Sequence, residues 1–85
     1  MDVDVVLYRN ADWTAIATYG ARGSTWRDCV DAINYWLRIE VMPYWKPEDI
    51  RIAACAGTDP HAAAALYGIG RAWGIIDNAD HDWLR

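Results

Sequence analysis

The side chains best suited to chemistry are few and lie far apart along the 85 residues. His61 falls in the first turn of an expected helix, where the helix dipole disfavours its cation and would favour a neutral base. Cys29, His61 and an acid would make a nucleophilic set. However, Cys29 falls on an apolar helical stripe, and reactive thiols need an exposed, electropositive setting. We therefore interpret His61 as a surface residue at a helix start and Cys29 as part of the core.

A second group of possible ligands lies near the end of the sequence. Asp77, Asp80, His81 and Asp82 would suit a hard or borderline cation. Their spacing matches no calcium loop, because the glycine and the terminal glutamate of that motif are missing. We interpret the stretch from about residue 77 as a solvated acidic tail, and we expect no catalytic residue, no metal and no cofactor.

A short glycine-containing segment, Gly20-Ala21-Arg22-Gly23, precedes an expected helix start, as phosphate-binding loops do. Neither G-x-x-x-x-G-K-[ST] nor G-x-G-x-x-G is present. We interpret the segment as a flexible connector.

The composition favours contact with a protein rather than with nucleic acid. The chain has a net charge of −4, and its eight basic residues are dispersed. Nucleic-acid binding relies on clustered Lys and Arg that neutralise phosphates, so an acidic surface favours a basic protein partner instead. The six Trp and five Tyr exceed what the core of so small a domain can bury, and exposed Trp and Tyr are common anchors at interfaces.

The cysteines and the apolar stretches indicate the cellular compartment. Two states of the cysteines remain open, buried free thiols or a Cys29–Cys55 bridge, and a reducing cytoplasm is the simpler compartment. The sequence has no basic leader followed by an apolar run, and no apolar stretch of the ~20 residues that span a bilayer. We expect a cytoplasmic protein without a signal peptide or membrane contact.

Two strands are expected first. Residues 3–8 alternate with Val3, Val5 and Leu7 inward, and residues 13–19 alternate with one side made of Trp13, Ala15, Ala17 and Tyr19. The polar residues 9–12 join them as an antiparallel hairpin. Asp2 and Asp4 are interpreted as charges that guard an edge strand.

The stretch from Ser24 to Trp45 predicts an amphipathic helix. Ser24 or Thr25 is the expected cap, Thr25 with Asp28 fits a capping box, and Pro43 ends the helix. Apolar residues recur at three and four positions along one stripe. The members of that stripe are Trp26, Cys29, Val30, Ile33, Trp36, Leu37 and Val41.

A third strand, 50–56, and a second helix from Asp59 to about Ile76 complete the order. Asp59 is the expected N-cap with Pro60 at the first helical position, and Asn78 is the expected terminator. The predicted buried stripe consists of Ala62, Ala65, Leu66, Ile69, Ala72, Trp73 and Ile76. Glycines 68, 70 and 74 within this helix favour close backbone packing, or else a dimer contact.

The order β-β-α-β-α predicts an α+β fold in one compact domain, 1–85. We expect a small two-layer sandwich, in which a three-stranded antiparallel sheet of order 3-1-2 is covered on one face by two helices.

The outer side of the first helix and the loop after it form the predicted partner-binding surface. Interface-forming residue types gather there beside carboxylates. The surface comprises Asp28, Asp31, Tyr35, Arg38, Ile39, Met42, Tyr44 and Trp45. Tyr67, Arg71 and Ile75 are expected on the outer side of the second helix. Two alternatives stay open: Trp45 folds back over the core, and the exposed apolar residues are an ordinary surface scatter.

We therefore expect a small acidic protein-binding module that is not an enzyme. Its partner would be a larger protein or complex with a basic surface. The specific hypothesis is a phage or mobile-element inhibitor, anti-CRISPR-like or anti-restriction-like, that covers the nucleic-acid-binding surface of a defence complex. The first alternative is a self-associating accessory subunit, such as a homodimer. The second is a small metal-dependent enzyme that uses the acidic tail.

Overall fold

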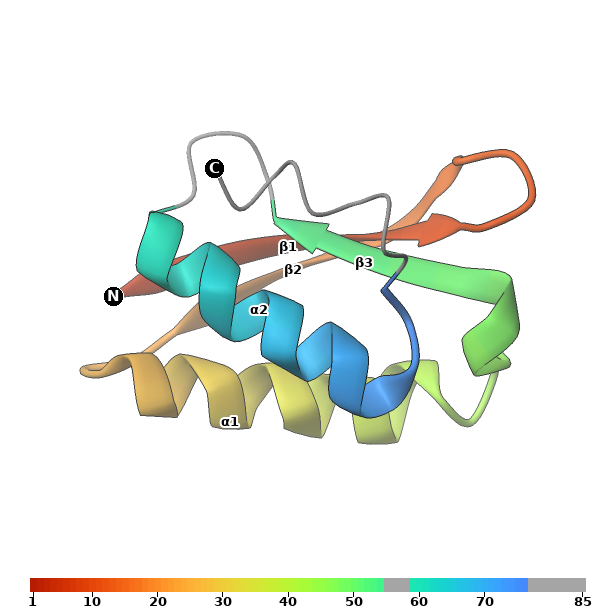
Figure 1. The fold of residues 1–85 in the computed structure, drawn as a ribbon. Coiled ribbons are helices and arrows are strands. Elements are labelled where there is room, and N and C mark those ends of the chain that lie inside the picture. Colours follow the sequence, from red (N-terminus) through yellow and green to blue (C-terminus); the bar gives the residue numbers. More distant parts are fainter. Residues whose placement is uncertain (55–58, 77–85) are drawn as a thin grey trace.

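Two helices lie next to each other against one face of a three-stranded antiparallel sheet in the computed structural model (Figure 1). The structure describes residues 1–54 and 59–76. The strands are β1 (Asp2–Arg9), β2 (Ala15–Arg22) and β3 (Ile50–Ala54), in the order β2-β1-β3. The helices are α1 (Trp26–Trp36), the π-helical turn η1 (Leu37–Val41), the 3-10 turn η2 (Pro47–Asp49) and α2 (Pro60–Trp73). The predicted α+β fold and sheet order are confirmed.

β1 is the central strand, paired with β2 on one side and β3 on the other. Val3, Val5 and Leu7 are buried as predicted. Val6 is buried as well, although the alternation placed it outward; as a central-strand residue it has Thr18 of β2 and Ala53 of β3 as neighbours. Asp2 and Asp4, interpreted as guards of an edge strand, belong to the central strand β1, but the described pairing with β3 covers only Val5–Arg9, so their guarding role stays a prediction.

β2 begins and ends later than predicted. Trp13 lies in the turn before it, and residues 20–22, predicted as a connector, continue the strand in register with Asp2–Asp4. The pairing shifts at Leu7/Tyr8, which marks a bulge. The predicted bounds of this strand were wrong because its end is determined by pairing with β1 and not by the glycines in the sequence.

α1 begins as its sequence predicts. The Thr25 hydroxyl accepts a hydrogen bond from the Asp28 backbone N–H at 3.1 Å, and the Asp28 carboxylate accepts from the Thr25 N–H at 3.2 Å. These reciprocal bonds form the capping box. Farther along, the indole of Trp36 stacks on the ring of Tyr19 and so joins α1 to β2. The ring centres are 5.0 Å apart and the angle between the ring planes is 8°. The predicted stripe is buried at Cys29, Ile33, Trp36, Leu37 and Val41, with Trp26 and Val30 packed beside it.

α2 is capped by the Asp59 carboxylate, which accepts from the His61 N–H at 2.8 Å, as predicted. The helix ends earlier than expected, at Gly74, whose φ of +72° suits glycine best. Gly74 is therefore a cap rather than an interior glycine, and Asn78 lies outside the described residues.

The early end of α2 changes two predicted orientations. Ile75, expected on the outer side, is fully buried, since the chain turns back there and its carbonyl accepts a hydrogen bond from Ile52 N–H at 2.8 Å. Ala72, expected in the buried stripe, is exposed. The close approach expected of the glycines occurs at Gly70, where an added Cβ would lie 3.0 Å from both Ile52 Cγ2 and Ile76 Cβ. Gly68 faces open space.

Candidate protein-binding surface

The outer side of α1 and η1 exposes large apolar groups. Tyr35 is 60% exposed and Ile39 is 48% exposed, one helical turn apart. The guanidinium carbon of Arg38 lies 5.8 Å from the centre of the Tyr35 ring, within cation–π range. This contact holds the ring of Tyr35 beside a charged group while leaving most of it accessible.

The two carboxylates nearest the start of α1 have local partners. Asp28 is bound to the backbone N–H groups of Ser24 and Thr25, at 3.0 and 3.2 Å. Asp31 lies 3.6 Å from Arg27, and both side chains are mostly exposed. Exposed ion pairs of this kind contribute little to stability. Asp31 can therefore exchange its partner, whereas Asp28 is needed to cap the helix.

The predicted surface continues through η1 into the loop before β3. η1 is a π-helical turn in which Met42 N–H donates to Leu37 C=O at 2.8 Å, and such turns are frequent at functional sites. Tyr44 is 77% exposed, whereas Met42 and Trp45 are partly buried against the core. Trp45 packs on the core, as one of the two alternatives from the sequence expected, and it also borders a surface hollow.

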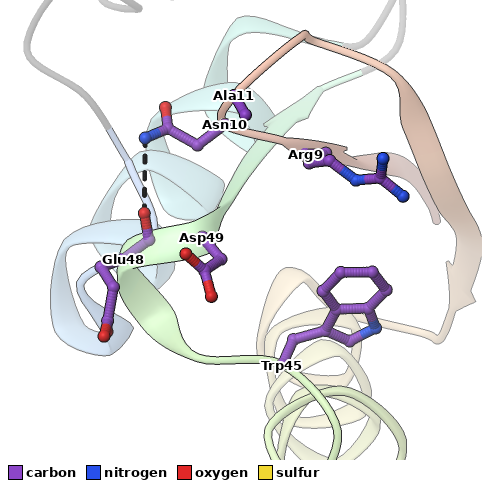
Figure 2. Close-up of a pocket in the computed structure, with 6 residues that line it drawn as sticks. All are labelled: Arg9, Asn10, Ala11, Trp45, Glu48 and Asp49. Atoms are coloured by element: carbon purple, nitrogen blue, oxygen red, sulfur yellow. Dashed lines mark hydrogen bonds between the residues drawn. The ribbon is translucent and has the colours of Figure 1, made fainter.

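That hollow, of about 310 Å³, lies between the β1–β2 turn and η2 (Figure 2). Its two sides are joined by Asn10, whose backbone N–H donates to Asp49 C=O at 2.8 Å and whose side-chain amide donates to Glu48 C=O at 3.3 Å. The residues that line it are Arg9, Asn10, Ala11, Trp45, Glu48 and Asp49. Only Trp45 belonged to the predicted surface.

The β1–β2 turn also presents Trp13, which the sequence placed in a strand. Trp13 is 50% exposed, has a φ of +59° and packs against Tyr8 with ring centres 5.9 Å apart. A left-handed backbone is uncommon for a bulky residue. It is held here by Trp13 N–H donating to Arg9 C=O and by Thr14 N–H donating to the Asp12 carboxylate. The polar segment 9–12 indicated a turn, but no local signal indicated its left-handed tryptophan.

Among the described residues, Asp12 is the one whose pKa is clearly shifted. Hydrogen bonds from Thr14 hold the pKa of the Asp12 carboxyl below its ordinary value of 3.8, and the nearby Arg9 adds to this effect. The Arg9 guanidinium lies 3.7 Å from the Asp12 carboxylate. The charge of Arg9 is therefore balanced within its own turn.

The side chains considered for catalysis do not come together in the described part of the chain. Cys29 is a buried free thiol whose Sγ lies 3.5 Å from the carbonyl oxygen of Met1, and His61 is exposed at the start of α2. Across residues 1–54 and 59–76, no three His, Cys, Asp or Glu side chains are grouped to hold a metal. The acidic tail from residue 77 and Cys55 lie outside the described residues.

Comparisons of the chain with protein-family models, with curated proteins and with solved structures gave no match. Among the helices described, none has the length and apolarity needed to cross a membrane.

Proposed function

We propose that this chain is a small protein-binding module that acts by covering part of a partner's surface. The observation that carries the proposal is the exposure of Tyr35, Ile39 and Tyr44 along α1, η1 and the following loop. Tyrosine and large aliphatic side chains that are fixed on a helix, and not needed for the core, are typical anchors of protein interfaces.

The charge of this end of the molecule supports a basic partner. Segment 40–49 contains three carboxylates, Glu40, Glu48 and Asp49, against Lys46, a net charge of −2 from three acids and one base. None of these four side chains forms an ion pair with another described residue. Unpaired carboxylates around aromatic anchors attract a basic surface and fix its orientation. Inhibition of a nucleic-acid-binding defence complex, by covering its basic site, is the specific form of this proposal.

The test is binding to a partner captured from the organism that carries the gene and then purified. We expect the double substitution Tyr35→Ala and Asp31→Lys to weaken binding by about 1–3 kcal/mol, because it removes an anchor and reverses a steering charge. The control is Thr18→Ala, at an exposed position on β2. Equal affinities of the double variant and the wild type for the purified partner would remove this surface from the proposal.

Self-association is a second use of the same surface, and light scattering separates the two. A stable dimer that Tyr35→Ala dissociates would assign the exposed aromatics to an interface between copies. The glycine-bearing face of α2 offers less support for a dimer than the sequence suggested, because Gly70 packs on Ile52 and Ile76 of the same chain and Gly74 caps the helix.

A further inference from the structure

We infer that the hollow between the β1–β2 turn and η2 is a seat for one basic side chain, arginine or lysine, of the partner protein. This inference rests on the proposed function and identifies the group that would be recognised at its acidic end.

The walls provide an aromatic surface and a carboxylate. Trp45 and Asp49 border the hollow from different sides, and the side chain of Glu48 points away from Trp45 (Figure 2). An indole and a carboxylate are the two groups that best receive a guanidinium or ammonium, through cation–π attraction and through a charge-assisted hydrogen bond.

The charge balance at the hollow favours a cation over an anion. Arg9 lines the hollow but is paired with Asp12 at 3.7 Å, and in Figure 2 its guanidinium points away from Asp49. The carboxylates of Glu48 and Asp49 make no hydrogen bond or ion pair with any described residue. Arg51 donates to the carbonyls of Pro47 and Ile50 and does not line the hollow. The residues that line the hollow, Arg9 with Glu48 and Asp49, therefore carry a net charge of −1, and the two carboxylates have no ion-pair partner among the described residues.

The hollow is preformed and of limited size. Asn10 binds the carbonyls of both Glu48 and Asp49, and Asp49 N–H donates to Lys46 C=O at 3.0 Å, so the acidic wall is braced from both sides. A volume of about 310 Å³ is at the lower limit of small-molecule pockets. It accommodates a single long side chain, and Tyr44 on the adjoining loop continues the contact surface beyond it.

The experiment is an NMR titration of the full chain with Nα-acetyl-arginine amide and Nα-acetyl-lysine amide. We expect saturable shifts of the Trp45 indole N–H and of the Asn10 side-chain amide. The neutral Nα-acetyl-norleucine amide should produce neither. Binding of Nα-acetyl-glutamate amide in place of the cations would show an anion site governed by Arg9 and would overturn the inference, as would the absence of saturable shifts with either cation.

Asp49→Asn keeps the backbone carbonyl that Asn10 binds and removes the charge. We expect it to weaken binding of the arginine probe by about two- to fivefold, the range for loss of one exposed ion pair. Glu48→Gln provides a second variant with a smaller expected loss. Asp4→Asn is the matched control, since it removes an equal charge from an exposed position on β1 outside the hollow. Equal weakening by Asp49→Asn and Asp4→Asn would reduce the effect to net charge and contradict the seat.

The result of the probe titration can be distinguished from the result of the partner-binding test. If the probes fail to bind while Tyr35→Ala still weakens binding of the purified partner, the seat is wrong and the binding surface stands. If the probes bind but the partner is insensitive to Tyr35→Ala and Asp31→Lys, the hollow is a cation site without the proposed surface.

Discussion

The indole N–H of Trp73 donates a hydrogen bond of 2.9 Å to the side-chain oxygen of Asn34, joining α2 to α1 across 39 positions of sequence. Both groups are partly buried. The bond fixes the relative position of the two helices on the sheet, and therefore the direction in which the outer side of α1 faces.

We expect Trp73→Phe and Asn34→Ala each to lower the free energy of unfolding. In a double-mutant cycle, the coupling between the two positions should be about 1 kcal/mol, the net value of a typical hydrogen bond. Urea unfolding of the four proteins gives the coupling directly. Strict additivity would mean that the bond contributes nothing to stability.

The two glycines within α2 should respond oppositely to alanine. At Gly70 a methyl group meets Ile52 and Ile76 at 3.0 Å, and overpacking costs about 1–3 kcal/mol, which exceeds the ~1 kcal/mol gained in helix propensity. At Gly68 nothing lies within 4 Å, so Gly68→Ala should stabilise by about 0.5–1 kcal/mol. Thermal unfolding of the pair compares them in one background. Stabilisation by Gly70→Ala would contradict the close packing.

The capping box at the start of α1 should affect stability rather than recognition. Thr25→Ala is expected to cost about 1 kcal/mol, and Asp28→Ala a similar amount, because each leaves backbone N–H groups without their side-chain acceptor. Asp31→Ala is the control, expected to change stability by less than about 0.5 kcal/mol. Chemical denaturation measures all three. An Asp28→Ala protein as stable as the wild type would show that the cap is dispensable.

Acidification should act on the β1–β2 turn. The hydrogen bonds from Thr14 lower the pKa of Asp12 in the folded protein, so the ionised form stabilises the turn. The contribution is complete above the unfolded pKa, near 3.8, and is lost as the pH falls through the lower, folded pKa. An NMR titration of the Asp12 carboxyl should show a midpoint below that of a free aspartate, accompanied by a shift of the Thr14 amide. A midpoint at or above 3.8 would contradict these bonds.

The sequence predicted the elements that are determined by short-range chemistry. Thr25 with Asp28 and Asp59 with Pro60 fix helix starts through contacts within four residues, and the apolar stripe of α1 was confirmed. The end of α2 was predicted too late, because Gly74 was read as an interior glycine rather than a left-handed cap. Ile75 was misplaced for the same reason.

The hollow could not be predicted from the sequence. Arg9 and Asn10 are separated from Trp45 and Asp49 by more than thirty positions, and only the pairing of β1 with β3 brings the two segments together. Tyr35 and Ile39 were predictable as exposed because their positions fall off the buried stripe of the first helix, and Tyr44 because it follows Pro43 in a loop. Their use in binding stays a prediction.

The hydrogen bond from Ile52 N–H to Ile75 C=O closes part of the outer edge of β3. In the described structure no segment pairs in this way with the outer edge of β2. An added strand would meet an occupied donor at Ile52, so the outer edge of β2 is the more open of the two edges in the described residues. Two copies could join through the outer edges of their β2 strands. For a further copy to pair along the whole of β3, the hydrogen bond between Ile52 and Ile75 would first have to break.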